Sequence, residues 1–314
     1  MLTVDFRRLP LRQGDLVLDA GCGEGRHLFE CFRHDCSILG MDLDHRSLLK
    51  ARYVLGQMRE RKEASGRFLL LQGDALRFPF ADGTFDKIIC AEVIEHVVDD
   101  RLGIAELARI LKSGGKIAVT VPTLFTEHVY DKLSQEYFRT PGGHIRKVTP
   151  RALANSMEEN GLRVYAVGFA HAFHSPYWML RCIFGLHDEK AFVPLIYRKF
   201  LHLSLFSKPL RMTEKICNYF FPKSIILYAQ KVSKVRSSEL GFLTPYSELR
   251  TPYSELPTTT SLLRTFLFKP RAEGFDFREV FKGKKCFFVR ENIQFAGCSY
   301  FLPAPSVRVY SGDL

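Results

Sequence analysis

The sequence predicts an α/β fold in which helices cover both faces of a parallel β-sheet, and three observations predict it. Short apolar runs alternate with helical segments between residue 15 and about residue 120. The first run, Leu16–Leu18, leads into three alternating glycines and then into a helix that begins at Arg26. Acidic residues, Asp42 and Asp74, follow two later runs. This arrangement is typical of a sheet that binds a ligand at the carboxyl ends of its strands.

Length and composition limit the possibilities further. The 314 residues suit one large domain, or one domain with an appendage, and a hydrophobic content of 46% is ample for a core. The net charge of +11 favours an anionic partner without naming it. The first residues lack the apolar region of a signal peptide, and no apolar run is long enough to cross a membrane. The eight cysteines show no paired C-x-x-C spacing, so we expect a reduced, cytoplasmic protein without structural zinc.

The glycine turn has the pattern Asp19-x-Gly21-x-Gly23-x-Gly25. Glycines allow a sharp turn and a close approach of the backbone to a ligand, and the helix start offers unpaired N–H groups. A dinucleotide fingerprint would need glycine where Arg26 stands, and the Gly-Lys-Ser/Thr of a P-loop is absent. A tight strand-to-helix turn gives the same letters, so the turn alone leaves the ligand open.

The remaining elements follow in order. Strands are expected at 37–42, 68–72, 85–92, 116–122, 162–169 and 224–229. A helix over 44–61 should bury one face, made of Leu48, Ala51, Leu55 and Met58. A further helix, capped by Asp99 and ended by Gly114-Gly115, should turn four residues inward: Leu102, Ala105, Ala108 and Leu111. Short helices are expected at 126–139 and near 150–161.

Four segments carry a family resemblance: "LDAGCGEG", "GMDLD", "QGDALRFPFADGTFDKIICAEVIEHV" and "ELARILKSGGKIAVTVP". In order and spacing they resemble the motifs of class I S-adenosylmethionine-dependent methyltransferases, in particular the type 11 family, over about the first 120 residues. The resemblance implies a Rossmann-like seven-stranded sheet with helices on both faces and an antiparallel edge strand inserted beside the sixth. About fifty residues, 170–223, separate strands six and seven. We expect this helical insertion, with residues 123–148, to form a substrate lid.

The resemblance also implies the cofactor, S-adenosyl-L-methionine. The residues that it assigns to the cofactor are Asp19, Gly21, Gly23, Asp42, Leu43, Asp74, Ala75 and Glu92. An acid at Asp42 can accept both ribose hydroxyls, and the acid after the third strand usually holds the adenine amino group. Glu92 to His96 would lie where methyl donor and acceptor meet. Taken singly, an acid such as Asp42 or Asp74 is more often a helix cap or a loop acid, and it is the four motifs in register that favour the cofactor site.

Histidines are the candidates for the base that removes a proton from a hydroxyl acceptor. His144 follows Gly142-Gly143 on a turn and is the first choice, with His96 and His174 as further candidates. His96 can also be interpreted as a structural residue. Each histidine taken alone can be interpreted as a residue that only packs against its neighbours. His171 and His174 have a spacing that can bind metal, but no acid or third ligand lies nearby in the sequence, so no metal is expected.

The insertion is basic and rich in aromatic residues, a combination that can indicate nucleic acid. A helical cap with a solvated basic rim is the interpretation we favour, and the Asn/Asp-Pro-Pro-Tyr type of motif is absent after the fourth strand, where Ala91–Ile94 stand. Its central stretch places apolar residues at helical spacing: Phe192, Leu195, Ile196, Phe200 and Leu203. We expect this face to form an apolar acceptor pocket and to contact the inner face of a membrane; the alternative is that it packs on the core.

The sequence therefore predicts methyl transfer to oxygen of a small or lipid-like acceptor. An RNA methyltransferase and a non-catalytic cofactor-binding module are the alternatives, and the intact glycines and acids argue against the second. Residues 1–231 are expected to form the methyltransferase domain, and 232–314 a linker-like extension that contains a duplicated heptad, Thr244–Arg250 and Thr251–Pro257. The stretch from Cys286 has strand character without a visible partner. No pattern indicates an oligomeric state.

Overall fold

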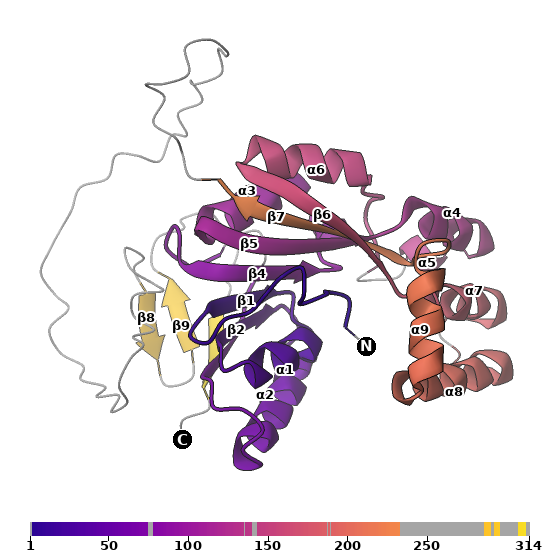
Figure 1. Ribbon diagram of the computed structural model, residues 1–314, viewed down its shortest axis with the longest axis horizontal. Helices are drawn as coiled ribbons and strands as arrows, with labels where there is room; N and C mark the ends of the chain where they lie inside the picture. The colour runs from indigo at the N-terminus through magenta and orange to yellow at the C-terminus, as the bar shows by residue number, and fades with distance from the viewer. Residues whose placement is uncertain are drawn as a thin grey trace, which may run out of the picture.

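The computed structural model describes residues 2–74, 78–134, 136–139, 143–186, 188, 190–232, 286–289, 292–295 and 307–311. Seven strands between residues 16 and 231 lie side by side in the order β6-β7-β5-β4-β1-β2-β3 (Figure 1). Their bounds are β1 (Leu16–Ala20), β2 (Ser37–Asp42), β3 (Phe68–Gln72), β4 (Phe85–Ala91), β5 (Leu111–Pro122), β6 (Leu162–Ala170) and β7 (Ser224–Lys231). The α/β fold with a seven-stranded sheet is thus confirmed.

The sheet is parallel except at β7, which pairs antiparallel with both β5 and β6. The seventh strand is antiparallel, as expected, but the expectation that it forms an edge is wrong, because β7 lies between β5 and β6 and β6 is the edge. β2 and β3 lie on one side of β1 in the sheet, and β4 and β5 lie on its other side. Ligands of such sheets bind where the strand order reverses, which here is between β1 and β4.

Helices cover both faces of the sheet, so β1 is buried along its whole length. Alternate residues of β1 contribute to two separate cores: Leu16 and Leu18 to one, Val17 to the other. The first core contains residues of α3 (Asp100–Ile110) and α6 (Pro150–Glu159), and the second contains residues of α1 (Arg26–Arg33) and α2 (His45–Glu60).

The residues expected to be buried are the buried ones in α2 but only partly so in α3. In α2 the four residues expected inside are the buried ones, and the Asp44 side chain caps the helix by accepting from the N–H groups of Arg46 and Ser47. In α3 the Asp99 cap is confirmed and Ala108 is buried as expected, but Leu102 is 45% exposed, and Ile104 and Leu107 are buried in the core. The helix ends at Ile110, before the expected end at Gly114-Gly115, because the buried Leu111 and both glycines belong to β5.

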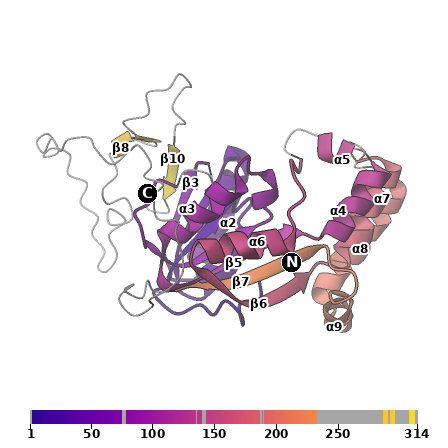
Figure 2. The same cartoon turned by 90° about the horizontal axis from the view of Figure 1, so that it is seen from above.

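Three helices occupy the long connection between β6 and β7, as the sequence predicts: α7 (His174–Phe184), α8 (Phe192–Phe206) and α9 (Lys208–Cys217). They stand beyond the end of the sheet together with α4 (Leu124–Leu133) and α5 (Glu136–Arg139), as Figure 2 shows. No described helix is long and apolar enough to cross a membrane.

Three short strands follow in the described part of the C-terminal extension: β8 (Cys286–Val289), β9 (Asn292–Phe295) and β10 (Val307–Ser311). β10 pairs antiparallel with β3 and extends the sheet at that edge. The stretch from Cys286 therefore has the strand partners that the sequence did not reveal. The duplicated heptad lies outside the described residues, and the domain boundary near residue 231 stays a prediction.

Candidate functional site

The glycine turn after β1 is fixed to the end of β2 by its backbone. Gly21, Gly23 and Gly25 all have positive φ angles, 72°, 52° and 91°, which explains why glycine stands at each position. The N–H of Gly21 donates to the carbonyl of Met41 at 2.7 Å, and the N–H of Gly23 donates to the Asp42 carboxylate at 2.7 Å. A Cβ added to Gly23 would have no atom within 4 Å, so the turn faces open space there.

Asp19 has a buried carboxylate without a partner. Its side chain is fully buried near the carboxyl end of β1, and neither carboxylate oxygen accepts a hydrogen bond from a described residue. Burial raises the pKa of Asp19 to about 7. A buried carboxylate without a hydrogen-bond partner lowers the stability of the fold, so its presence indicates that a bound donor or cation completes the site.

The other residues expected at the cofactor lie at the same carboxyl edge. Asp42 ends β2, and its second oxygen accepts the N–H of Asp44 at 2.8 Å. Leu43 is 68% exposed and Asp74, just after β3, is exposed as well. Ala75 lies outside the described residues. The structure thus brings Asp19, the glycines and Asp42 together, with Leu43 and Asp74 on the rim.

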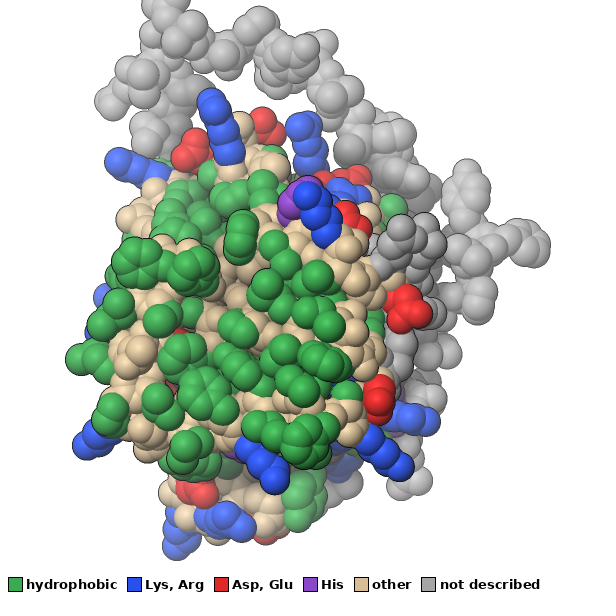
Figure 3. All heavy atoms as spheres, turned by 90° about the vertical axis from the view of Figure 1, so that its right-hand side faces the viewer, with side chains coloured by type: hydrophobic (Ala, Val, Ile, Leu, Met, Phe, Trp, Pro, Cys, Tyr) green, Lys and Arg blue, Asp and Glu red, His purple; other side chains and the backbone are tan. Residues whose placement is uncertain are grey.

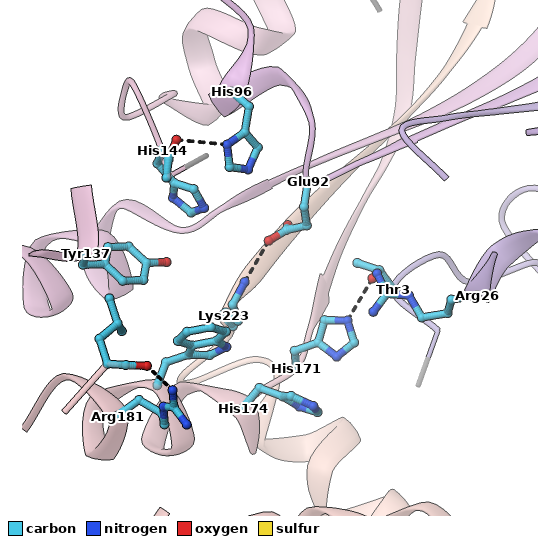
Figure 4. Close-up of a pocket in the computed structure, with 13 residues that line it drawn as sticks. Thr3, Arg26, Glu92, His96, Tyr137, His144, His171, His174, Arg181 and Lys223 are labelled. Carbon is cyan, nitrogen blue, oxygen red and sulfur yellow. Dashed lines mark hydrogen bonds and ion pairs between the residues drawn. The ribbon is translucent and has the colours of Figure 1, made fainter. Parts of the chain in front are cut away.

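A cavity of about 540 Å³ opens beside this turn, at the carboxyl end of β4. It brings together all three candidate histidines, which come from different parts of the chain, and Glu92 (Figure 4). Its lining residues are Thr3, Arg26, Glu92, His96, Tyr137, Gly143, His144, His171, His174, Trp178, Arg181, Leu186 and Lys223. The glycines and Asp42 are not among them, and Arg26, the first residue of α1, connects the turn to the cavity.

Glu92 lies at the cavity wall and is held by two residues, Thr120 and Lys223. Its backbone adopts a φ of 58°, unusual for a non-glycine residue, and its N–H donates to Thr120. Its carboxylate accepts the Thr120 hydroxyl at 3.2 Å and pairs with the Lys223 ammonium at 2.8 Å. Burial is the largest single influence on the pKa of Glu92 and would raise it, but the charge and the hydrogen bond of Lys223, with smaller contributions from Ser224 and His144, together lower the pKa below its usual value. Glu92 therefore stays ionised.

His144 is paired with a carboxylate that the sequence analysis missed. Its Nδ1 lies within hydrogen-bonding distance of Oε1 of Glu127, a residue of α4 that is 1% exposed. The His144 ring points into the cavity toward Tyr137, whose ring centroid is 5.3 Å away (Figure 4). The signal for Glu127 was its position one residue after Thr126 and three before Tyr130, on the buried face of a short amphipathic helix.

His96 lies beside His144, with ring centroids 4.9 Å apart. Its Nδ1 is 3.1 Å from the carbonyl oxygen of Gly143, and burial lowers the pKa of its ring. The neighbouring Glu95 is fully buried, with no described partner for either oxygen, and burial raises its pKa well above the usual range. His96 thus supports the loop that carries His144.

His174 occupies the opposite wall of the cavity and faces His171, at a centroid distance of 5.1 Å. Burial lowers the pKa of His174 to about 4 and the pKa of His171 far below its usual value, so both rings are neutral at neutral pH. The absence of an acid near this pair, which the sequence suggested, is wrong in three dimensions: Glu214 of α9 offers a ligand atom within 4.8 Å of those of the two histidines.

Comparison with known proteins identifies the first part of the chain. Residues 18–119 match the family model described as "Methyltransferase domain". The O-methyltransferase cnsE of Penicillium expansum is 29% identical over 113 residues, 36% of this chain and 40% of that enzyme. The demethylmenaquinone methyltransferase of Corynebacterium urealyticum is 34% identical over 36% of this chain and 44% of its own length. The chain thus spans less than half the length of either relative.

Similarity to solved structures extends further along the chain. The [4+2]-cyclase SpnF is 20% identical, with a TM-score of 0.48 over 72% of this chain and 79% of that one.

The carboxyl edge of the sheet fits S-adenosylmethionine. Asp42, at the end of β2, can accept hydrogen bonds from the two ribose hydroxyls. The ammonium group of the methionine part is a cation that could pair with the carboxylate of Asp19, which has no described partner. Gly23 leaves the space that a Cβ would take. Residues 18–119 therefore belong to the class I S-adenosylmethionine-dependent methyltransferase family.

Proposed function

We propose that this chain transfers the methyl group of S-adenosylmethionine to an oxygen of a small or lipid-like acceptor. The observation that carries the proposal is the pairing of His144 with the buried Glu127 at the wall of the cavity. A volume of about 540 Å³ suits a small organic ligand. Relatives whose names mention an O-methyltransferase, a sterol methyltransferase and a demethylmenaquinone methyltransferase support an acceptor of this class.

The chemistry of the cavity follows from its own residues. When bound, S-adenosylmethionine supplies an electrophilic sulfonium methyl group. With Glu127 ionised, His144 donates its Nδ1–H to the carboxylate, so the basic nitrogen is Nε2. Nε2 can take the proton of an acceptor hydroxyl as the oxygen attacks, and Glu127 stabilises the imidazolium that forms. The rest of the cavity wall positions the acceptor and excludes water.

We further propose that the insertion rests on an anionic membrane surface, at the inner face of the membrane. Many large apolar side chains of the insertion and of the turn before β7 are exposed: Ile183, Phe184, Phe192, Val193, Ile196, Leu203, Phe206, Met212, Ile216, Tyr219, Phe220 and Phe221. Figure 3 shows apolar side chains gathered over this end of the molecule, with Lys and Arg at the margin. An apolar face with a basic rim suits a membrane with anionic headgroups.

The acceptor class is tested by incubating the protein and labelled S-adenosylmethionine with a cell extract. Label in the lipid or small-molecule fraction is the expected result. Label in the RNA fraction would support an RNA methyltransferase instead. No transfer, with cofactor bound, would support the non-catalytic module.

The base is tested with the acceptor identified in this way. The variant His144→Gln should lower kcat by about a hundredfold or more, because a positioned base contributes that much. Glu127→Gln should also lower kcat. His128→Gln, at an exposed position of the same helix, is the matched control and should leave kcat unchanged. Normal turnover by His144→Gln would exclude His144 as the base.

A further inference from the structure

We propose that His171, His174 and Glu214 form a binding site for a divalent transition-metal ion, with Zn²⁺ as the ion to test. One ligand atom from each of the three side chains lies within 4.8 Å of the others. Two imidazoles and one carboxylate are a ligand set that zinc takes in proteins, with a fourth position left for water or substrate. The proposal goes beyond methyl transfer and stands or falls independently of it.

Three unpartnered atoms carry the inference. Nδ1 of His171, Nδ1 of His174 and Oε1 of Glu214 are buried, and none has a hydrogen-bond partner among the described residues. His171 is 6% exposed and Glu214 is 5% exposed. Native structures rarely leave buried polar atoms unsatisfied, and three such atoms in one cluster are more unusual still. A single cation would satisfy all three.

The groups around the cluster hold its members in place. Nε2 of His171 lies 2.9 Å from the Thr3 hydroxyl, so a proton on Nε2 can be donated to Thr3, and Nδ1, which has no described partner, then keeps its lone pair for an ion. The N–H of Ala172 donates to Oδ1 of Asn218, just after α9, at 2.8 Å. The turn after β6 and the end of α9 are thus fixed to each other before any ion binds.

A second cluster with suitable residue types is less complete. Glu95, His96 and His144 also offer ligand atoms within 4.8 Å. There, however, Nδ1 of His96 is bonded to the Gly143 carbonyl and Nδ1 of His144 to Glu127, and the only buried side-chain atoms of that cluster without a described partner are the two oxygens of Glu95. The observations therefore favour the site at His171, His174 and Glu214.

An ion at this site would connect three elements. His171 follows β6, His174 begins α7 and Glu214 lies on α9, so the ion would fasten the insertion to the end of the sheet. His171 and His174 also line the cavity, as Figure 4 shows, so the ion would lie at its wall. Occupancy should therefore stabilise the protein against unfolding.

The test uses the full chain, purified without a polyhistidine tag and treated with a chelator. Calorimetric titration with ZnCl₂ should show one ion bound per chain. Glu214→Gln and His174→Gln should each weaken binding by about tenfold or more, and Thr3→Val, which removes only the hydroxyl beside His171, by about tenfold. His202→Gln, at an exposed position of α8, and His96→Gln, in the other cluster, are the controls and should bind normally.

Cobalt substitution gives a second readout on the unaltered chain, which decides the ligand type even if a variant does not fold. Bound Co²⁺ should show visible absorption without the charge-transfer band of a thiolate ligand. Absence of a stoichiometric site, or a thiolate band, would overturn the proposal. So would equal zinc affinity in all variants, which indicates adventitious surface binding, or a loss confined to His96→Gln, which assigns the ion to the other cluster.

Discussion

Asp19 and Asp42 lie at the carboxyl ends of neighbouring strands, but they differ in their hydrogen bonds. Asp42 is tied to the glycine turn and to its own following turn, so its position is fixed before a ligand arrives. Asp19 is fully buried without a described partner. Its burial destabilises the ionised form, and the free protein therefore holds it partly protonated near neutral pH.

This state of Asp19 predicts a pH dependence of stability. Folding raises the pKa of Asp19 from 3.8 to about 7. The contribution of its protonation to the free energy of unfolding is therefore fully present below about pH 4 and is lost as the pH rises to 7. The variant Asp19→Asn does not ionise. Relative to wild type, its free energy of unfolding should rise by up to about 4 kcal/mol between pH 4 and pH 7. Thermal unfolding of both proteins across this range measures the difference; a constant difference would contradict the buried acid.

Some site residues were predictable from the sequence and others were not. Asp19, the glycines and Asp42 were found because one strand, one turn and the next strand end form a short, regular pattern. Glu127 and Lys223 were missed because their partners, His144 and Glu92, lie 17 and 131 residues away in the sequence. Glu214 was missed for the same reason. Pairings of this kind depend on how segments far apart in the chain pack against each other, and local periodicity does not encode that.

At the scale of elements, the insertion differs from its expected role. The sequence predicts that the apolar face of α8 lines an acceptor pocket, but no residue of α8 lines the cavity. The insertion contributes His171, His174, Trp178, Arg181, Leu186 and Lys223 to the lining. Phe192, Ile196 and Leu203 are instead 73%, 50% and 60% exposed. Helical spacing identified an apolar face correctly, but it does not say what covers that face.

The membrane proposal makes a prediction about this face. The full chain should co-sediment with anionic vesicles at low salt, and Phe192→Asp together with Phe206→Asp should weaken binding by about tenfold or more, because each change removes a large apolar side chain from the interface. Tyr53→Asp, at a residue of α2 that is 71% exposed, is the control and should bind as wild type does. No sedimentation of the wild type would remove the proposal.

At the scale of the whole molecule, the order of strands and helices followed from the sequence, because alternating apolar runs and amphipathic segments fix it. The partner of β10 did not, since pairing with β3 joins strands that are far apart in the chain. The described residues of both cores lie between Val4 and Ala229.

A chain truncated after Val232 should consequently fold and still bind S-adenosylmethionine. Its seven strands and both described cores are complete, and the described elements that it loses are β8, β9 and β10, which lie beyond β3 in the sheet. Circular dichroism and calorimetric titration with the cofactor check this. A truncated chain that is insoluble, when the full chain is soluble, would show that the extension belongs to the folding unit.

Calorimetric titration of the full chain with S-adenosylmethionine tests the central claim most directly. The wild type should bind one molecule per chain. Asp42→Ala should weaken binding by about 1–3 kcal/mol, because the ribose hydroxyls lose their acceptor. Gly23→Val should abolish it, because its side chain would fill the open space beside the turn. Glu60→Ala, at an exposed acid of α2, should leave the affinity unchanged. Wild-type affinity in both Asp42→Ala and Gly23→Val would contradict the assignment of the site.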